Sequence, residues 1–189
     1  DEKMRLVIRR AVSARMQEET LEGRFIASAL HYKGTNSNLM PLEEGAQARI
    51  LVCDHALDDR NFLATQVSEV FVGENAHLEL YELEETHVKC HRMSNMYVQM
   101  QANSTAVLDN ITLQNGQTRN RTDVQLAGQG AEVHMNGCVI ADQKQHVDNN
   151  TLIDHAAPHC QSHELYKYVL DDEAVGAFAG RILVREGAQ

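Results

Sequence analysis

Residues 124–135 of the chain read Val-Gln-Leu-Ala-Gly-Gln-Gly-Ala-Glu-Val-His-Met. Apolar side chains take every second position at both ends of this stretch, and polar side chains separate them. Successive side chains of an extended strand point to opposite faces, so this alternation predicts strands with one buried face. The alternating apolar positions are Val124, Leu126, Ala131, Val133 and Met135.

The same alternation recurs along the chain from Pro41 onward. It occurs at Ala48, Ile50 and Val52, at Ala76, Leu78 and Leu80, at Val98, Met100 and Ala102, and at Phe178, Ile182 and Val184. Near Leu80 and Tyr81 the phase slips by one residue, which predicts a bulge or a corner in that strand. We therefore expect a series of strands that each bury one face.

These strands recur at a regular interval. A small residue, often after Gly or Asn, precedes the alternation at positions 46, 76, 105 and 131, in steps of 30, 29 and 26 residues. The next match, Ala174, lies 43 residues further, which indicates an insertion or a missed coil. A period of this length without a helical pattern inside it favours an all-β parallel β-helix, a solenoid with two long strands per coil. Antiparallel sandwiches turn over every ~8–12 residues instead.

The first forty residues differ from the rest. Their apolar positions are spaced as one face of a helix, which predicts a helix over residues 4–20 that stops near Gly23. Residues 34–38, Gly-Thr-Asn-Ser-Asn, are typical of a loop. We expect a short, partly helical flank over residues 1–40 and a β-helix core over residues 41–189. The helical face consists of Met4, Val7, Ile8, Ala11 and Val12.

The chain has 189 residues and a formal net charge of −10. This acidity argues against nucleic acid as a partner, because a nucleic-acid-binding surface is positive, and against docking on an anionic membrane. Residues 41–85 carry 11 acids and two bases, which predicts a solvated outer face or, alternatively, a patch for a basic partner. The four cysteines form no CxxC pair, which is typical of a reducing cytoplasm.

Residues 155–163, His-Ala-Ala-Pro-His-Cys-Gln-Ser-His, hold the densest set of candidate metal ligands. Neutral imidazole and thiolate bind zinc and iron well. On one extended strand the three histidines would spread over ~26 Å, so a metal site needs a bend or a second strand. Hydrogen-bonded structural histidines are the alternative interpretation. The candidate ligands are His155, His159, Cys160 and His163.

Several longer motifs occur in order in the last third of the chain. They are Leu126-Ala-Gly-Gln-Gly-Ala-Glu-Val-His-Met-Asn-Gly137, Gln145-His-Val-Asp-Asn-Asn-Thr151, Glu164-Leu-Tyr-Lys167, Val169-Leu-Asp-Asp172 and Phe178-Ala-Gly-Arg-Ile182. With these motifs the chain resembles the SufB/SufD family, the scaffold proteins of the SUF system for iron–sulfur cluster assembly. It resembles the SufD branch more than the SufB branch, and the resemblance covers residues 41–189.

The resemblance implies a right-handed parallel β-helix that acts as a non-catalytic scaffold in the cytoplasm. The implied partners are a SufB-like scaffold and a SufC-like ABC-type ATPase. No cofactor is expected on this chain itself, whereas a transient iron–sulfur cluster or iron is implied for the full complex. The family's histidine-bearing Cys-Ser-His-Gly-Ala segment and its ATPase-docking helices would lie after Gln189. No catalytic residue is therefore carried over.

The residues that match the family motifs are assigned a structural role. We expect a buried polar corner between successive coils, in which Ser162 and Lys167 satisfy backbone groups. The motif residues are Gln145, His146, Asp148, His155, Ser162, Lys167, Phe178 and Gly180.

The last predicted strand, near residues 178–184, is a candidate interface. Alternation places Phe178 and Ile182 on the core face and Leu183 on the outer face, between Arg181 and Arg185. A strand at a sheet edge leaves N–H and C=O groups unpaired. We therefore expect a weak homodimer through this edge.

Two other functions remain open for a β-helix. A sugar-active lyase or glycosidase would line an exposed groove with paired carboxylates and aromatic side chains, yet aromatic residues make up only 5% of the chain and Trp is absent. A histidine-rich metal-binding module rests on the ten histidines. Metal analysis would separate such a module from a scaffold.

Overall fold

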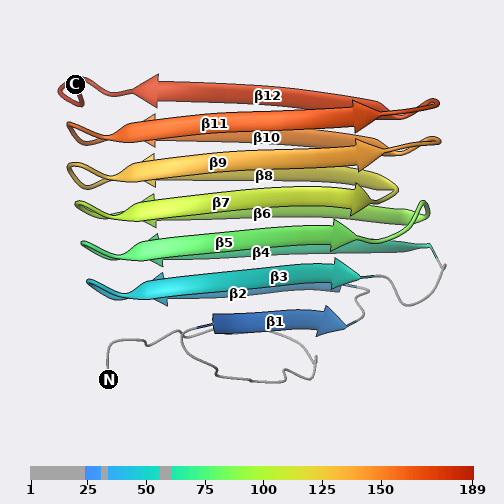
Figure 1. Ribbon diagram of the computed structural model, residues 1–189, viewed down its shortest axis with the longest axis horizontal. Helices are drawn as coiled ribbons and strands as arrows, with labels where there is room; N and C mark the ends of the chain where they lie inside the picture. The colour runs from blue at the N-terminus through green and yellow to red at the C-terminus, as the bar shows by residue number, and fades with distance from the viewer. Residues whose placement is uncertain (1–23, 31–33, 56–60) are drawn as a thin grey trace.

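The computed structural model describes residues 24–30, 34–55 and 61–189, so the helix predicted over residues 4–20 lies outside the described residues. The described residues form strands that build two sheets, one of odd-numbered and one of even-numbered strands, and all neighbouring strands are parallel (Figure 1). The strands are β1 (Arg24–Leu30), β2 (Gly34–Leu42), β3 (Gln47–His55), β4 (Phe62–Val72), β5 (His77–Glu85), β6 (Cys90–Met100), β7 (Thr105–Gln114), β8 (Gln117–Leu126), β9 (Glu132–Ala141), β10 (His146–His155), β11 (Gln161–Leu170) and β12 (Val175–Val184).

The chain winds as a solenoid, as the sequence predicts. In Figure 1 it runs to the right along the near sheet, returns to the left along the far sheet and climbs toward the C-terminus, so the coil is right-handed. Each coil adds one strand to each sheet, and the parallel ladders bond its backbone groups to the coils below and above. Within the described residues, no helix has the length and hydrophobicity needed to cross a membrane.

One corner repeats in every coil and sets the period. A residue with positive φ lies two positions before each of the strands β3, β5, β7, β9 and β11, and two of the five are glycines. Residues without glycine's freedom rarely adopt this left-handed conformation, so the corner constrains the sequence at intervals of 27–30 residues. The five corner residues are Gly45 (φ 66°), Asn75 (56°), Asn103 (53°), Gly130 (71°) and His159 (60°).

The corner explains the irregular step to Ala174. That residue precedes β12, which belongs to the even-numbered sheet, and therefore lies in a different place of the coil. The true successor of Ala131 is Cys160, and the Gln161 amide donates to the Ala131 carbonyl at 3.0 Å. Strand β11 escaped prediction because its first two inward positions, Ser162 and Glu164, are polar and interrupt the apolar alternation.

The solenoid begins earlier in the chain than the sequence predicts. Residues 34–38, expected as a loop, are part of β2, which pairs with β4 from Gly34 to Leu42. Position 41, the expected start of the core, thus lies inside a strand. The polar composition of this segment predicted a loop, but a polar side chain can lie inside the coil when it has a hydrogen-bond partner. Asn38 has one, because its Nδ2 donates to Ser68 Oγ of the next coil at 3.2 Å.

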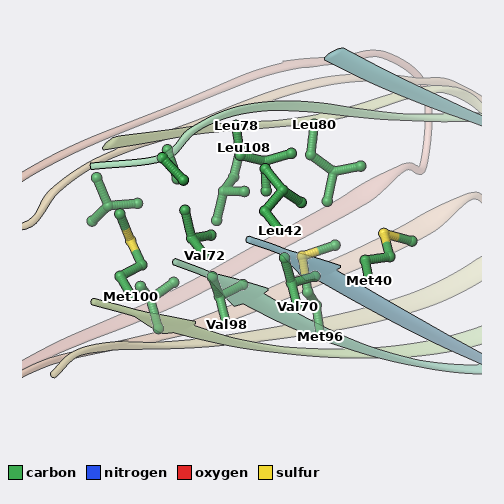
Figure 2. Close-up of a cluster of buried hydrophobic side chains, with 14 of the residues drawn as sticks. Met40, Leu42, Val70, Val72, Leu78, Leu80, Met96, Val98, Met100 and Leu108 are labelled. Atoms are coloured by element: carbon green, nitrogen blue, oxygen red, sulfur yellow. The ribbon is translucent and has the colours of Figure 1, made fainter. Parts of the chain in front are cut away.

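The interior of the coils is apolar along one side, where the odd-numbered strands begin and the even-numbered strands end. Figure 2 shows this cluster, in which side chains from the start of odd strands meet side chains from the end of even strands. They meet because the two sheets run in opposite directions. Val133 is fully buried there, as predicted. The labelled members are Met40, Leu42, Val70, Val72, Leu78, Leu80, Met96, Val98, Met100 and Leu108.

One expectation about the inward face is wrong, and another holds for the orientation of the side chains but not for their burial. The register shift in β5 lies between Glu84 and Glu85, not near Leu80, because the inward series continues with buried glutamates that imitate a slip in the hydrophobic pattern. On β12, Phe178 and Ile182 are in register with the inward residues Asn149 and Ile153, but they are 45% and 56% exposed. Among the described residues β12 has a neighbour on one side only, so its inward side chains are only partly covered.

Candidate functional site

The other end of the coil interior carries buried charged residues. Glu82 and Glu84 point inward from the last half of β5, and Arg92 points inward from the first half of β6. All three side chains are buried, and Arg92 is only 4% exposed. The composition of residues 41–85 suggested a solvated acidic face, and that expectation is wrong for these two glutamates.

Arg92 is the centre of this charged network. Its Nε and one terminal nitrogen lie 2.9 Å from Oδ2 of Asp54, and its other terminal nitrogen donates to Oδ1 of Asn120 at 2.7 Å. Asn120 in turn donates to Asn149 Oδ1 at 2.9 Å. The guanidinium therefore joins β3, β6 and β8, and its contact with Asp54 spans 38 residues of sequence.

Each glutamate has its own set of hydrogen-bond donors. Glu82 accepts from Gln66 Nε2 at 3.2 Å and from Asn110 Nδ2 at 3.3 Å. Glu84 accepts from threonine hydroxyls, most closely from Thr118 at 2.7 Å. Buried polar groups with bonded partners avoid the desolvation penalty that unpaired ones incur.

The electrostatics of the network favour a retained proton. Burial raises the pKa of Glu82 and of Glu84, although the charge of Arg92 opposes both shifts. Burial opposes the charge of Arg92, but the neighbouring carboxylates, Asp54 first, raise the pKa of its guanidinium. One cation facing three carboxyl groups cannot neutralise them all, so protonation of a glutamate offsets the excess negative charge. These hydrogen bonds and ion pairs connect strands of successive coils from inside. The raised pKa of Glu82 and Glu84 favours the protonated form of their carboxyl groups.

The four predicted metal ligands lie in different environments. His155, at the end of β10, shares a 3.0 Å hydrogen bond between Nε2 and Ser162 Oγ. His159 is the corner residue described above, and the Cys160 thiol donates to the Gly128 carbonyl at 3.3 Å. His163 lies on the outer face of β11. In the described part of the chain, none of the first three belongs to a group of three ligands close enough to hold one ion.

The family-motif residues occupy several environments. Gln145 is buried at a corner, where its Oε1 accepts from the Asp142 amide at 3.0 Å. Asp148 and His146 lie on β10, and Asp148 Oδ1 accepts from Asn150 at 2.8 Å. Lys167 is exposed on β11, so it does not lie in the buried corner expected for it. Ser162 bonds the side chain of His155 at the end of β10 and not a backbone group.

Phe178 and Gly180, the remaining motif residues, lie on β12 at the open edge. The rings of Phe178 and Tyr166 pack with their centroids 4.8 Å apart. Tyr166 in turn covers Gly137, where an added Cβ would lie 2.0 Å from a ring carbon. The Tyr166 ring therefore leaves no room for a side chain at Gly137, which explains why a glycine stands at that position of the motif.

The predicted interface strand has a charge pattern that the sequence does not reveal. Arg185 donates to both carboxylate oxygens of Asp154, at 2.9 and 2.5 Å, and its pKa is raised mainly by that hydrogen bonding. Leu183 is 46% exposed on the outer face. Because Arg185 is paired with Asp154, the positive charge beside Leu183 is partly neutralised, and Arg181 and Arg185 repel a second copy less than two unpaired arginines would.

The fold defines a class of protein: a right-handed parallel β-solenoid whose interior is filled by an apolar cluster and a bonded polar network. The family described as "SUF system FeS cluster assembly, SufBD core domain" matches residues 25–189, which includes the first strands that the resemblance had left out. The chain belongs to this SufBD family.

Curated relatives agree with that membership. The chain is 24% identical over 149 residues to the iron–sulfur cluster assembly protein SufD of Escherichia coli (strain K12), a match that covers 79% of this chain and 35% of the relative. It is 36% identical over 74 residues to an iron–sulfur cluster assembly SufBD family protein of Mycobacterium leprae (strain TN), covering 38% of this chain and 19% of that protein. The chain thus spans about a third or less of the length of these relatives.

Proposed function

We propose that the chain is part of a non-catalytic scaffold that builds iron–sulfur clusters in a SUF-type complex. The observation that carries this proposal is the family match over residues 25–189, which spans nearly the whole ladder of strands. The name of the Escherichia coli relative, an iron–sulfur cluster assembly protein SufD, supports the same role. The cluster, or its iron, is the transient cargo of the complex.

The partners that we propose are a SufB-like scaffold and a SufC-like ATPase. The contact that we propose for pairing with another β-solenoid is the edge formed by β11 and β12, the last strands of the two sheets among the described residues. Exposed apolar side chains accompany that edge, among them Leu165, Val169 and Leu183. An edge of this kind is a template for adding strands or for packing a second sheet. A homodimer through the same edge is the form we propose for the chain alone.

The working compartment that we propose is the cytoplasm. The four cysteines of the chain, Cys53, Cys90, Cys138 and Cys160, are all free in the structure. Thiols that stay unpaired in a folded protein fit a reducing compartment, where SUF-type assembly of an oxygen-sensitive cargo would take place.

Co-purification tests the scaffold proposal. The tagged chain is co-expressed with SufB-like and SufC-like proteins, and the captured complex is identified by mass spectrometry. Recovery of the second scaffold supports the proposal, and recovery of neither protein contradicts it. Recovery of the scaffold without the ATPase would place ATPase docking outside this chain.

Two matched variants locate the contact. Leu183→Lys places a charge on the open edge, whereas Leu63→Lys places the same charge on β4, at a leucine that is also exposed. We expect the first variant to weaken capture at least tenfold and the second to leave it unchanged. Light scattering of the chain alone over a concentration series tests the homodimer, and a monomer at every concentration would refute it.

A further inference from the structure

Three potential metal ligands gather on the outer face of the odd-numbered sheet. Glu132 and His134 lie two residues apart on β9, so both point to the same face. His163 on β11 is in direct register with His134. These residues are separate from the charged network inside the coil, and only His163 belongs to the segment that the sequence singled out.

The geometry brings their ligand atoms within reach of one ion. The imidazole rings of His134 and His163 are stacked, with centroids 4.6 Å apart and planes 18° apart. His134 Nε2 lies 2.7 Å from Glu132 Oε1. One ligand atom from each residue lies within 4.8 Å of the other two. The ring separation follows from the ~4.8 Å spacing of neighbouring strands, so the backbone holds the pair together.

We propose that Glu132, His134 and His163 bind one first-row divalent transition-metal ion of the zinc, cobalt or nickel class. Two imidazoles and one carboxylate are a ligand set that these ions accept, with water completing the coordination. Bond lengths near 2.0–2.1 Å in a tetrahedral site require nitrogens ~3.3 Å apart, so the two rings must tilt toward each other. An ion bound to His134 Nε2 would replace the hydrogen bond between that atom and Glu132 Oε1.

The surroundings permit these adjustments. His163 is exposed, and the side chains of His134 and Glu132 are 42% and 35% exposed, so solvent reaches the site and the rings can turn. The formal net charge of −10 attracts a cation. In the coils below, the positions in register with His134 are Val107 and Glu79, so the two-histidine pair belongs to β9 and β11.

A bound ion would join β9 to β11, the outermost strand of this sheet among the described residues. An ion that binds the folded chain and not the unfolded chain stabilises the fold by mass action. Metal should therefore raise the melting temperature as well as bind. This site does not depend on the proposed scaffold function.

The test is a titration of chelator-treated chain with zinc chloride by calorimetry, and with cobalt chloride by visible absorption. We expect one equivalent to bind with a Kd on the order of 1–10 µM, together with d–d absorption from cobalt and a melting temperature raised by several degrees. His134→Ala and His163→Ala should each weaken binding at least tenfold and abolish the thermal shift. All three residues are on the outer face, so circular dichroism of the variants without metal should match the parent.

Matched controls separate this site from the alternatives. His91→Ala removes an exposed histidine on the other sheet, and His159→Ala and Cys160→Ser remove the other candidate ligands; none should change affinity. No binding at 100 µM zinc overturns the proposal, and so does unchanged binding in the double variant of His134 and His163. Binding that is lost in Cys160→Ser and kept in His134→Ala would also overturn it. Co-purification with SUF partners would stand unaffected by any of these results.

Discussion

Replacing Arg92 by Met tests whether the charged network braces the coil. The substitution keeps much of the side-chain volume and removes the cation that faces Asp54, Glu82 and Glu84. It also removes the hydrogen bonds to Asp54 and Asn120. Removing one partner of a buried ion pair leaves an uncompensated charge, which costs about 3–5 kcal/mol. That is roughly a fifth or more of the ~5–15 kcal/mol stability of a typical domain.

Arg121→Met is the matched control. Arg121 also binds a carboxylate, that of Asp123 at 2.8 Å, but its side chain is 52% exposed. An exposed ion pair contributes about 0–1 kcal/mol. Urea unfolding followed by circular dichroism measures both free energies of unfolding. The reasoning is refuted if Arg92→Met costs no more than Arg121→Met.

The cost of Arg92→Met should also depend on pH. Burial raises the pKa of Glu82 and Glu84 in the folded chain, and Arg92 opposes that rise, so its loss moves both pKa values further up. A carboxyl group whose pKa is raised by folding costs stability as pH rises through the folded pKa, and the cost vanishes below the unfolded pKa near ~4.3. The deficit of the variant should therefore shrink as the pH falls toward the unfolded pKa near ~4.3. A second-site Glu82→Gln change should restore part of the lost stability at pH 8.

Three further substitutions test the coil at single positions. Val133→Asp should cost several kcal/mol of stability because it buries an unpaired charge in the apolar cluster. Ile140→Asp, on the outer face of β9, should cost little. Equal melting temperatures of the two variants would contradict the inward placement of Val133. Gly137→Ala should destabilise by about 1–3 kcal/mol in urea unfolding, because the new Cβ displaces the Tyr166 ring, and an unchanged midpoint would show that the ring yields freely. His159→Val should lower the unfolding free energy by about 1–2 kcal/mol, because β-branched residues resist positive φ. His159→Gly should not lower it. A Gly variant less stable than the Val variant would argue against the corner role of His159.

The sequence alone determined the architecture, because alternation within a strand is a local property. Val133 and Met135, like Ile50 and Val52, are buried where period-two alternation places them. The recurring corner was also visible, since Gly45, Asn75 and Gly130 precede the small residues at regular steps. These signals need no knowledge of neighbouring strands.

The tertiary structure decided which polar residues lie inside and which histidines meet. Glu82 and Glu84 interrupt the apolar pattern, and only their donors on other coils make burial tolerable. His134 and His163 are 29 residues apart and become neighbours because the corners set β9 and β11 in that register. His155, His159 and His163 are spaced evenly in sequence, yet the corner between β10 and β11 separates them: His155 bonds Ser162, His159 forms the corner and His163 is exposed on β11. Which residues meet depends on the number of residues in a full coil and on the geometry of its corners. A local sequence pattern contains neither, so it cannot predict these pairings.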